Sequence, residues 1–168
     1  MRNLYIAISM LIAVHLDSVF FNTFNIAGAR PDAMLVVVVS LGVLMGGLPA
    51  SLIGLAGGLF MDVMFNKPMG LAAMSYMLAG ALGGILYKKY YADNVILPAV
   101  VVAGAALVKE HIMALALKLL GGTYLYFDML LSYIIPSVLL SAALSMVVHA
   151  FLKRAFARQV GRRAEHRL

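Results

Sequence analysis

The residues of this chain that could do chemistry are ionisable side chains within long apolar runs. They are His15, Asp17, Asp62, Lys109, Glu110, His111 and His149. A charged side chain inside a bilayer is costly, so it usually faces the protein interior and finds a partner there. Counting along the helices indicates that five of them share the outward half of the membrane: Asp17, Asp62, Lys109, Glu110 and His111.

Several interpretations of these side chains are open. The first is a structural network of ion pairs, the second a surface that docks a partner protein, and the third a ligand pocket open to the outside. Because Lys109 and Glu110 are adjacent, we expect them to point to different helix faces and to pair with other helices. Asp62 with Lys109 is the preferred pair. A proton or ion pathway through Asp62, Lys109 and Glu110 is a further alternative.

Two more acidic residues stand at predicted helix starts. Asp32 follows Pro31, which suits a first helical turn, and its carboxylate can accept hydrogen bonds from free backbone amides there. We expect Asp32 and Asp128 to cap helices at the outer surface, so Asp32 joins the charged residues of the candidate site.

Motifs of catalysis are missing from the sequence. The chain has no cysteine, and it has neither an H-E-x-x-H metal motif nor a phosphate-binding loop. Glu110-His111 matches the end of an H-x-x-E-H site, but Leu107 occupies the position of the first histidine. The serines lie on apolar runs with no evident base, and we expect them to bond carbonyls of their own helices. The sequence therefore predicts no enzyme, no cofactor and no metal site.

The elements that must position these residues are predicted to be transmembrane helices. Hydrophobic residues make up 64% of the chain and charged residues 12%, against about half and about a quarter in soluble proteins. The 168 residues have room for roughly six spans of about 20 residues each. We predict an all-α polytopic bundle of about six transmembrane helices, with a single transmembrane domain over residues 1–152 and a basic tail over residues 153–168.

The apolar runs set the expected spans, at about residues 4–24, 33–65, 69–87, 95–120 and 129–152. Gly46-Gly47-Leu48-Pro49 breaks the second run, because glycine and proline interrupt helices. This predicts two short spans over residues 33–65, with a re-entrant hairpin as the alternative. A signal peptide cleaved after the first run is also an alternative, disfavoured because His15 and Asp17 interrupt that run.

Basic residues are distributed unevenly, and this sets the expected orientation. If both termini are cytoplasmic, Arg2, Lys88, Lys89 and the tail lie inside, while the outer side has only Arg30, Lys67 and Lys118. We therefore expect both termini in the cytoplasm. A basic tail beside a transmembrane helix favours anionic lipid over nucleic acid as its partner. Its basic residues are Lys153, Arg154, Arg158, Arg162, Arg163 and Arg167.

Small residues at four-residue spacing predict close helix packing. Ala50, Gly54 and Gly58 share one helix face, and Asp62 is the next member of that series. Gly80 and Gly84 repeat the pattern in the following run. We assign Gly70 to the same group of packing residues.

Three segments together resemble the family of the rod shape-determining protein MreD: Arg30-Pro31-Asp32, the segment 54–62 (GLAGGLFMD) and Pro68-Met69-Gly70-Leu71. The resemblance covers about the middle third of the chain. By position, the residues that match are Asp32, Gly54, Gly58, Asp62 and Gly70. The resemblance implies a non-catalytic subunit of the elongation machinery that inserts peptidoglycan into the bacterial side wall. It also implies MreC as the partner and, directly or indirectly, RodA, a penicillin-binding transpeptidase and MreB.

The main alternative function is the substrate-binding subunit of a vitamin transporter of the energy-coupling-factor type. Those subunits are also small, basic six-span proteins, and the MreD family is similar to them in architecture. The outward polar residues would then serve a ligand pocket. The absence of tryptophan and the short predicted outer loops disfavour this alternative.

Overall fold

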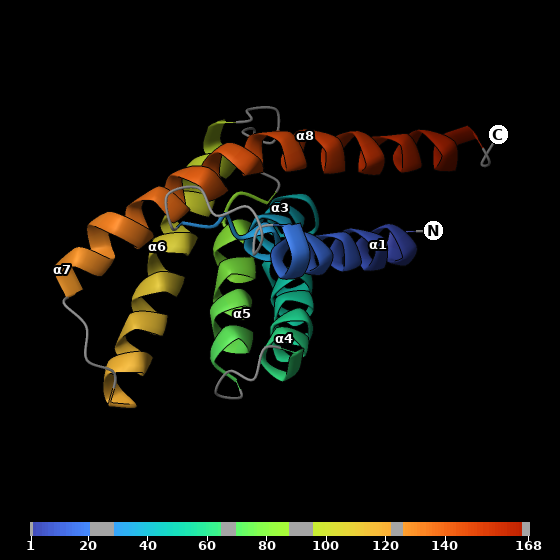
Figure 1. The fold of residues 1–168 in the computed structure, drawn as a ribbon. Helices are drawn as coiled ribbons and strands as arrows, with labels where there is room; N and C mark the ends of the chain where they lie inside the picture. The colour runs from blue at the N-terminus through green and yellow to red at the C-terminus, as the bar shows by residue number, and fades with distance from the viewer. Residues whose placement is uncertain (1, 21–28, 65–69, 88–95, 122–125, 166–168) are drawn as a thin grey trace.

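The computed structural model describes residues 2–20, 29–64, 70–87, 96–121 and 126–165. Figure 1 shows the chain as a set of packed α-helices. The elements are α1 (Arg2–His15), the short π-helical η1 (Leu16–Phe20), α3 (Ala33–Met45), α4 (Gly47–Met64), α5 (Leu71–Gly84), α6 (Ile96–Leu119), α7 (Tyr126–Met129), the π-helical η3 (Leu130–Ile134) and α8 (Ile135–Glu165).

Six apolar helical segments correspond in order to the six predicted spans. Three are long and apolar enough to cross a membrane: Gly47–Met64, Ile96–Leu119 and Leu130–Arg154. Three are shorter: Leu4–Val19, Ala33–Met45 and Leu71–Gly84. The prediction of an all-α bundle of about six apolar helices is therefore confirmed, and three of them have the length and composition to cross a membrane. The similarity to energy-coupling-factor subunits stays a prediction.

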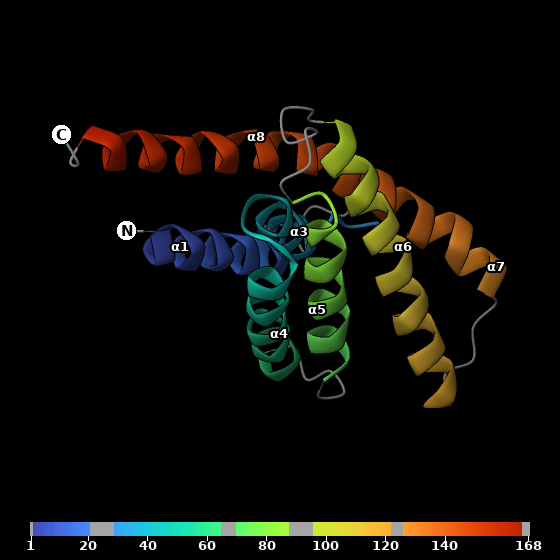
Figure 2. The ribbon, with the colours of Figure 1, turned by 180° about the vertical axis from the view of Figure 1, so that it is seen from behind.

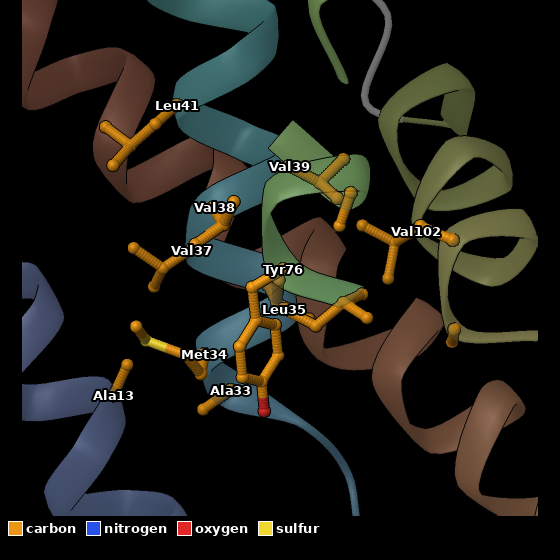
Figure 3. Packing of buried hydrophobic residues seen from close by; sticks show 14 of the residues in the cluster. Ala13, Ala33, Met34, Leu35, Val37, Val38, Val39, Leu41, Tyr76 and Val102 are labelled. Atoms are coloured by element: carbon orange, nitrogen blue, oxygen red, sulfur yellow. The ribbon is translucent and has the colours of Figure 1, made fainter. Parts of the chain in front are cut away.

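The shortest of these helices, α3, lies at the centre of the bundle. Eleven of its 13 residues are buried, and apart from Ser40 none of these has a polar side chain, as expected for a helix surrounded by protein. Figure 3 shows Met34, Val38 and Val39 pointing in different directions from α3 toward its neighbours. At about 20 Å, α3 is shorter than the roughly 30 Å hydrocarbon core. Of the two helices predicted in residues 33–65, only α4 has the length of a full span.

The other helices pack around α3 (Figures 1 and 2). α4 and α5 lie side by side and antiparallel, α6 lies beyond α5, and α8 packs against α6 and α3. α1 and the C-terminal part of α8 run across the direction of α4 and α5. The first turn of α1 and the last turn of α8 lie on the same side of the molecule.

The predicted break in the second apolar run is at Gly46, between α3 and α4. Its φ of 100° lies in a region that glycine adopts without a steric cost. Its N–H closes the end of α3 by donating to the carbonyl of Gly42 at 2.9 Å. The chain can therefore turn sharply and start α4 at once.

The small-residue series brings the backbones of α4 and α5 together. A Cβ added at Gly80 would lie 2.6 Å from the carbonyl carbon of Ala50, and one at Gly58 would lie 2.6 Å from the backbone nitrogen of Ala73. Gly54 faces the backbone of Tyr76, and Gly84 faces that of Gly47. Side chains at these positions would therefore hold the two helices apart.

Candidate functional site

Four ionisable residues gather where α3 begins, and we call them the ion cluster: Asp17, Asp32, Lys109 and Glu110. Asp17 comes from η1, Asp32 immediately precedes α3, and Lys109 and Glu110 come from α6. Asp32 is 8% exposed and Glu110 is 6% exposed. The cluster thus joins three elements that are distant in sequence inside the bundle.

Two carboxylates of the ion cluster hold the start of α3. The Asp32 carboxylate accepts from the N–H of Leu35 at 2.8 Å. Asp17 accepts from the N–H of Ala33 at 2.8 Å and from that of Met34 at 2.9 Å. These are the amides that a helix cannot satisfy internally, and the partial positive charge of the helix start favours the anions. The predicted capping role of Asp32 is confirmed. The residue is buried within the bundle, and its place at the outer membrane surface stays a prediction.

Lys109 supplies the positive charge of the ion cluster. Its Nζ lies 2.6 Å from Oδ2 of Asp32 and 3.0 Å from Oε1 of Glu110. The predicted pair of Asp62 with Lys109 is therefore wrong. The expectation that Lys109 and Glu110 cannot pair is also wrong. Their Cα–Cβ bonds diverge, but both side chains are long enough for the charged ends to meet.

Three hydroxyl groups that the sequence analysis did not single out complete the surroundings of Asp32. The Tyr76 hydroxyl lies 3.2 Å from Oδ2 of Asp32, and the Ser141 hydroxyl accepts from the Asp32 N–H at 2.9 Å. The Ser137 hydroxyl donates to the carbonyl of Arg30 at 2.6 Å. Ser137 and Ser141 are four residues apart on α8, and that spacing was the available signal of a polar helix face.

The serines thus divide into two groups. Ser75 and Ser145 bond carbonyls of their own helices, those of Leu71 and Ala142, as predicted. For Ser137 and Ser141 the prediction is wrong, because their hydroxyls bond the backbone that leads into α3.

Asp62 is the last member of the small-residue series on α4, and it serves the start of α5. Its carboxylate accepts from the N–H groups of Gly70 at 2.9 Å, Ala72 at 3.1 Å and Ala73 at 3.2 Å. These amides satisfy the carboxylate of Asp62, which is 1% exposed, and no lysine of the described segments forms an ion pair with it. Gly70 has a φ of 96°, and nothing lies within 4 Å of where its Cβ would be. Its assignment as a packing residue is therefore wrong, because the position requires glycine for its backbone conformation.

We expect Asp62→Leu to destabilise the protein by about 3 kcal/mol, since it leaves three backbone N–H groups at the start of α5 without their acceptor. Asp62→Asn keeps one acceptor oxygen and should cost about 1 kcal/mol. Thermal unfolding of the purified variants in detergent measures both. Equal losses for the two variants would show that the capping bonds contribute little.

The histidines lie apart from the ion cluster. The His111 side chain is exposed and its Nδ1 lies 2.7 Å from the carbonyl of Leu107 in the same helix, so the structure does not bring His111 into the predicted network. His15 is exposed at the end of α1, and His149 is buried in α8. Among the described residues, no group of three histidine, aspartate or glutamate side chains is arranged to hold a metal ion.

A cavity of about 350 Å³ adjoins the ion cluster. It lies between α6 and the segment from α7 to η3, and Leu71 at the start of α5 also lines it. Lys109, Glu110 and Tyr133 form its polar part, and its apolar wall includes Met113, Ala116 and Leu117. In this cavity the charges of the cluster meet space that another group could fill.

The basic residues assigned to the membrane surface belong to α8. The helix runs without a break from Ile135 to Glu165, so residues 152 and 153 are consecutive helical residues. Lys153 is half-buried and Arg154 is exposed. Arg158, Arg162 and Arg163 lie on the helical backbone beyond them, and Arg167 lies outside the described residues, as do Lys67, Lys88 and Lys89.

Comparison with known proteins gives one match. A family model described as the rod shape-determining protein MreD matches residues 1–158. No curated protein and no solved structure matches the chain. The family match extends well beyond the middle third that carries the resemblance in the sequence, and it includes the residues of α6 and most of α8.

Proposed function

This chain belongs to the MreD family of rod shape-determining proteins, and from that premise we propose that it is a non-catalytic membrane adaptor of the side-wall elongation machinery. We expect it to dock MreC and, through MreC, to associate with RodA, a penicillin-binding transpeptidase and MreB. Its place is the bacterial cytoplasmic membrane, with residues 1–152 as the transmembrane domain and residues 153–168 as the basic tail.

The use of three buried or half-buried carboxylates supports this proposal. Asp17, Asp32 and Asp62 all accept hydrogen bonds from backbone amides at the start of α3 or α5. A carboxylate bound in this way fixes a helix start and is a poor general base, because its lone pairs are occupied. The polar groups inside this bundle therefore support a role in holding helices in place, which is what an adaptor requires.

The length and charge of α8 support the expected orientation and lipid contact. With 31 residues, α8 is about 46 Å long, which exceeds the roughly 30 Å hydrocarbon core. Its basic end therefore extends beyond the apolar span, where anionic lipid attracts lysine and arginine. The first turn of α1 lies on the same side of the molecule, in agreement with two cytoplasmic termini.

A vitamin-binding subunit of the energy-coupling-factor type is the second candidate. The cavity beside Glu110 favours it, because about 350 Å³ falls within the range of small-ligand sites. The two candidates differ in what fills that cavity.

Affinity purification of the tagged full chain from its own membranes in a mild detergent, followed by mass spectrometry, distinguishes the two. We expect MreC and enzymes of wall synthesis to be recovered with the chain. His111→Ala is the control, since its exposed side chain lies outside the ion cluster and the same partners should be recovered. Recovery of a pair of ATPases with a transmembrane coupling subunit, or of a bound vitamin, would contradict the adaptor.

A further inference from the structure

The cavity beside the ion cluster has the shape of a slot along α6. Glu110, Met113 and Leu117 all line it, and their spacing of three and four residues places them on one face of the helix. From Glu110 to Leu120, which lines its far end, the slot extends over about 15 Å of α6. Its lining residues lie in, or directly next to, the apolar helices Ile96–Leu119, Leu130–Arg154 and Leu71–Gly84. The slot therefore lies at the depth of the membrane, polar at one end and apolar along its length.

The charge at the polar end of the slot is not balanced. The ion cluster holds three carboxylates and one lysine. Asp17 and Asp32 are compensated by the amides and the partial positive charge at the start of α3, and Asp32 also takes the shorter bond from Lys109, at 2.6 Å. Glu110 shares that lysine through Oε1 alone, at 3.0 Å. The charge of Arg30 also acts on Tyr133, so two cations face three carboxylates, and Glu110 has the weaker pairing with Lys109.

Two polar atoms at this end are available to an incoming group. Glu110 is only 6% exposed. Lys109 bonds its Oε1, and Oε2 forms no hydrogen bond with any residue that the structure describes. The hydroxyl of Tyr133, across the slot, likewise has no hydrogen-bond partner in the described segments. Neither atom is among the buried polar atoms that lack a partner, so both border the open space of the slot, where a cation with N–H donors would bind them.

We propose that this slot receives a lysine or arginine side chain from the transmembrane helix of a partner protein. The cationic group binds Oε2 of Glu110 and the Tyr133 hydroxyl, and the apolar stem packs against Met113 and Leu117. Lysine and arginine have this combination of a charged end and an apolar stem. The phosphate of a lipid headgroup would be repelled by Glu110, so a lipid is disfavoured. The inference rests on the proposed adaptor function and specifies where and how the partner docks.

Two variants test the site by co-purification of the co-expressed partner MreC with the full chain. Glu110→Gln removes the negative charge, and Ala116→Phe fills the slot. We expect each to reduce recovered MreC at least tenfold relative to the chain. The control is Leu115→Phe: Leu115 is the neighbouring residue of α6, is 61% exposed and lies outside the slot, so recovery should be unchanged. An unchanged thermal midpoint shows that a variant has folded.

Cysteine cross-linking locates the partner helix directly. The chain has no native cysteine, so Leu117→Cys reports only the slot and Leu115→Cys is its matched control. With single cysteines scanned along the partner's span, we expect disulfides with Leu117→Cys next to a lysine or arginine of the partner, and none with Leu115→Cys.

The outcomes separate this inference from the adaptor function. In one outcome, MreC co-purifies with the wild-type chain and equally with Ala116→Phe and Glu110→Gln, and Leu117→Cys does not cross-link. The slot is then not the docking site, and the adaptor function still holds. If MreC is not recovered even with the wild-type chain, the adaptor function fails and this inference fails with it. A lipid or small molecule retained by the wild-type chain and lost in Ala116→Phe would also overturn the inference.

Discussion

Replacing Lys109 with methionine is expected to destabilise the protein by about 3 to 5 kcal/mol, the largest effect of any single charged residue in the chain. The reason is the burial of Asp32, which is 8% exposed and depends on the Lys109 ammonium 2.6 Å away. Methionine keeps the apolar stem and removes only the charge and its hydrogen bonds. Unfolding of the purified protein in detergent, followed by circular dichroism, gives the change in free energy.

The matched control for this variant is His111→Ala, two residues farther along α6. The His111 side chain is exposed and contacts the carbonyl of Leu107 in its own helix, so the change should stay within about 0.5 kcal/mol. A loss of less than about 1 kcal/mol for Lys109→Met, or equal losses for the two variants, would show that the ion pair contributes little to the fold.

Replacing Gly80 with leucine is expected to destabilise the protein by about 3 kcal/mol, at the upper end of the usual range for overpacked positions. A Cβ at Gly80 would lie 2.6 Å from the carbonyl carbon of Ala50. That neighbour is backbone of α4 and cannot rotate away, so α4 and α5 must separate. Because the start of α5 is capped by Asp62 from α4, the separation also strains those hydrogen bonds. The unfolding measurement used for Lys109→Met applies here too.

Gly104 is the matched control for the packing prediction. It lies within α6, and nothing is found within 4 Å of where its Cβ would be. Gly104→Leu should therefore be neutral or stabilising by up to about 1 kcal/mol, since glycine is the poorer helix former. Similar losses at Gly80 and Gly104 would indicate a general cost of larger side chains and would contradict close contact between α4 and α5.

The helices and their close contacts could be predicted from the sequence because local patterns determine them. Apolar runs mark each helix, glycine and proline mark the break near Gly46, and the spacing of Gly54 and Gly58 marks the face of α4 that meets α5. The capping role of Asp32 follows from its position after Pro31. Each of these inferences needs only residues within a turn or two of one another.

The partners of the buried charges could not be predicted in the same way. Lys109 meets Asp32, 77 positions away in the sequence, because α3 packs beside α6, and no local pattern encodes that neighbour. The sequence favours a lysine as the partner of Asp62, because charged side chains are the only candidate partners that can be recognised in a sequence. The amides of Gly70, Ala72 and Ala73 satisfy it instead, and every residue except proline has such a group. Tyr76 also escaped notice, since one tyrosine in an apolar helix is not distinctive.

The buried charges stabilise the fold, and the ion pair of Asp32 and Lys109 holds the start of α3 against α6. A double-mutant cycle of Asp32→Asn and Lys109→Met in the detergent-solubilised full chain tests it most directly. We predict a coupling free energy of at least about 2 kcal/mol, with the double variant more stable than the sum of the single losses implies, because neither charge is left alone. Additive losses, with a coupling within about 0.5 kcal/mol of zero, would contradict the claim.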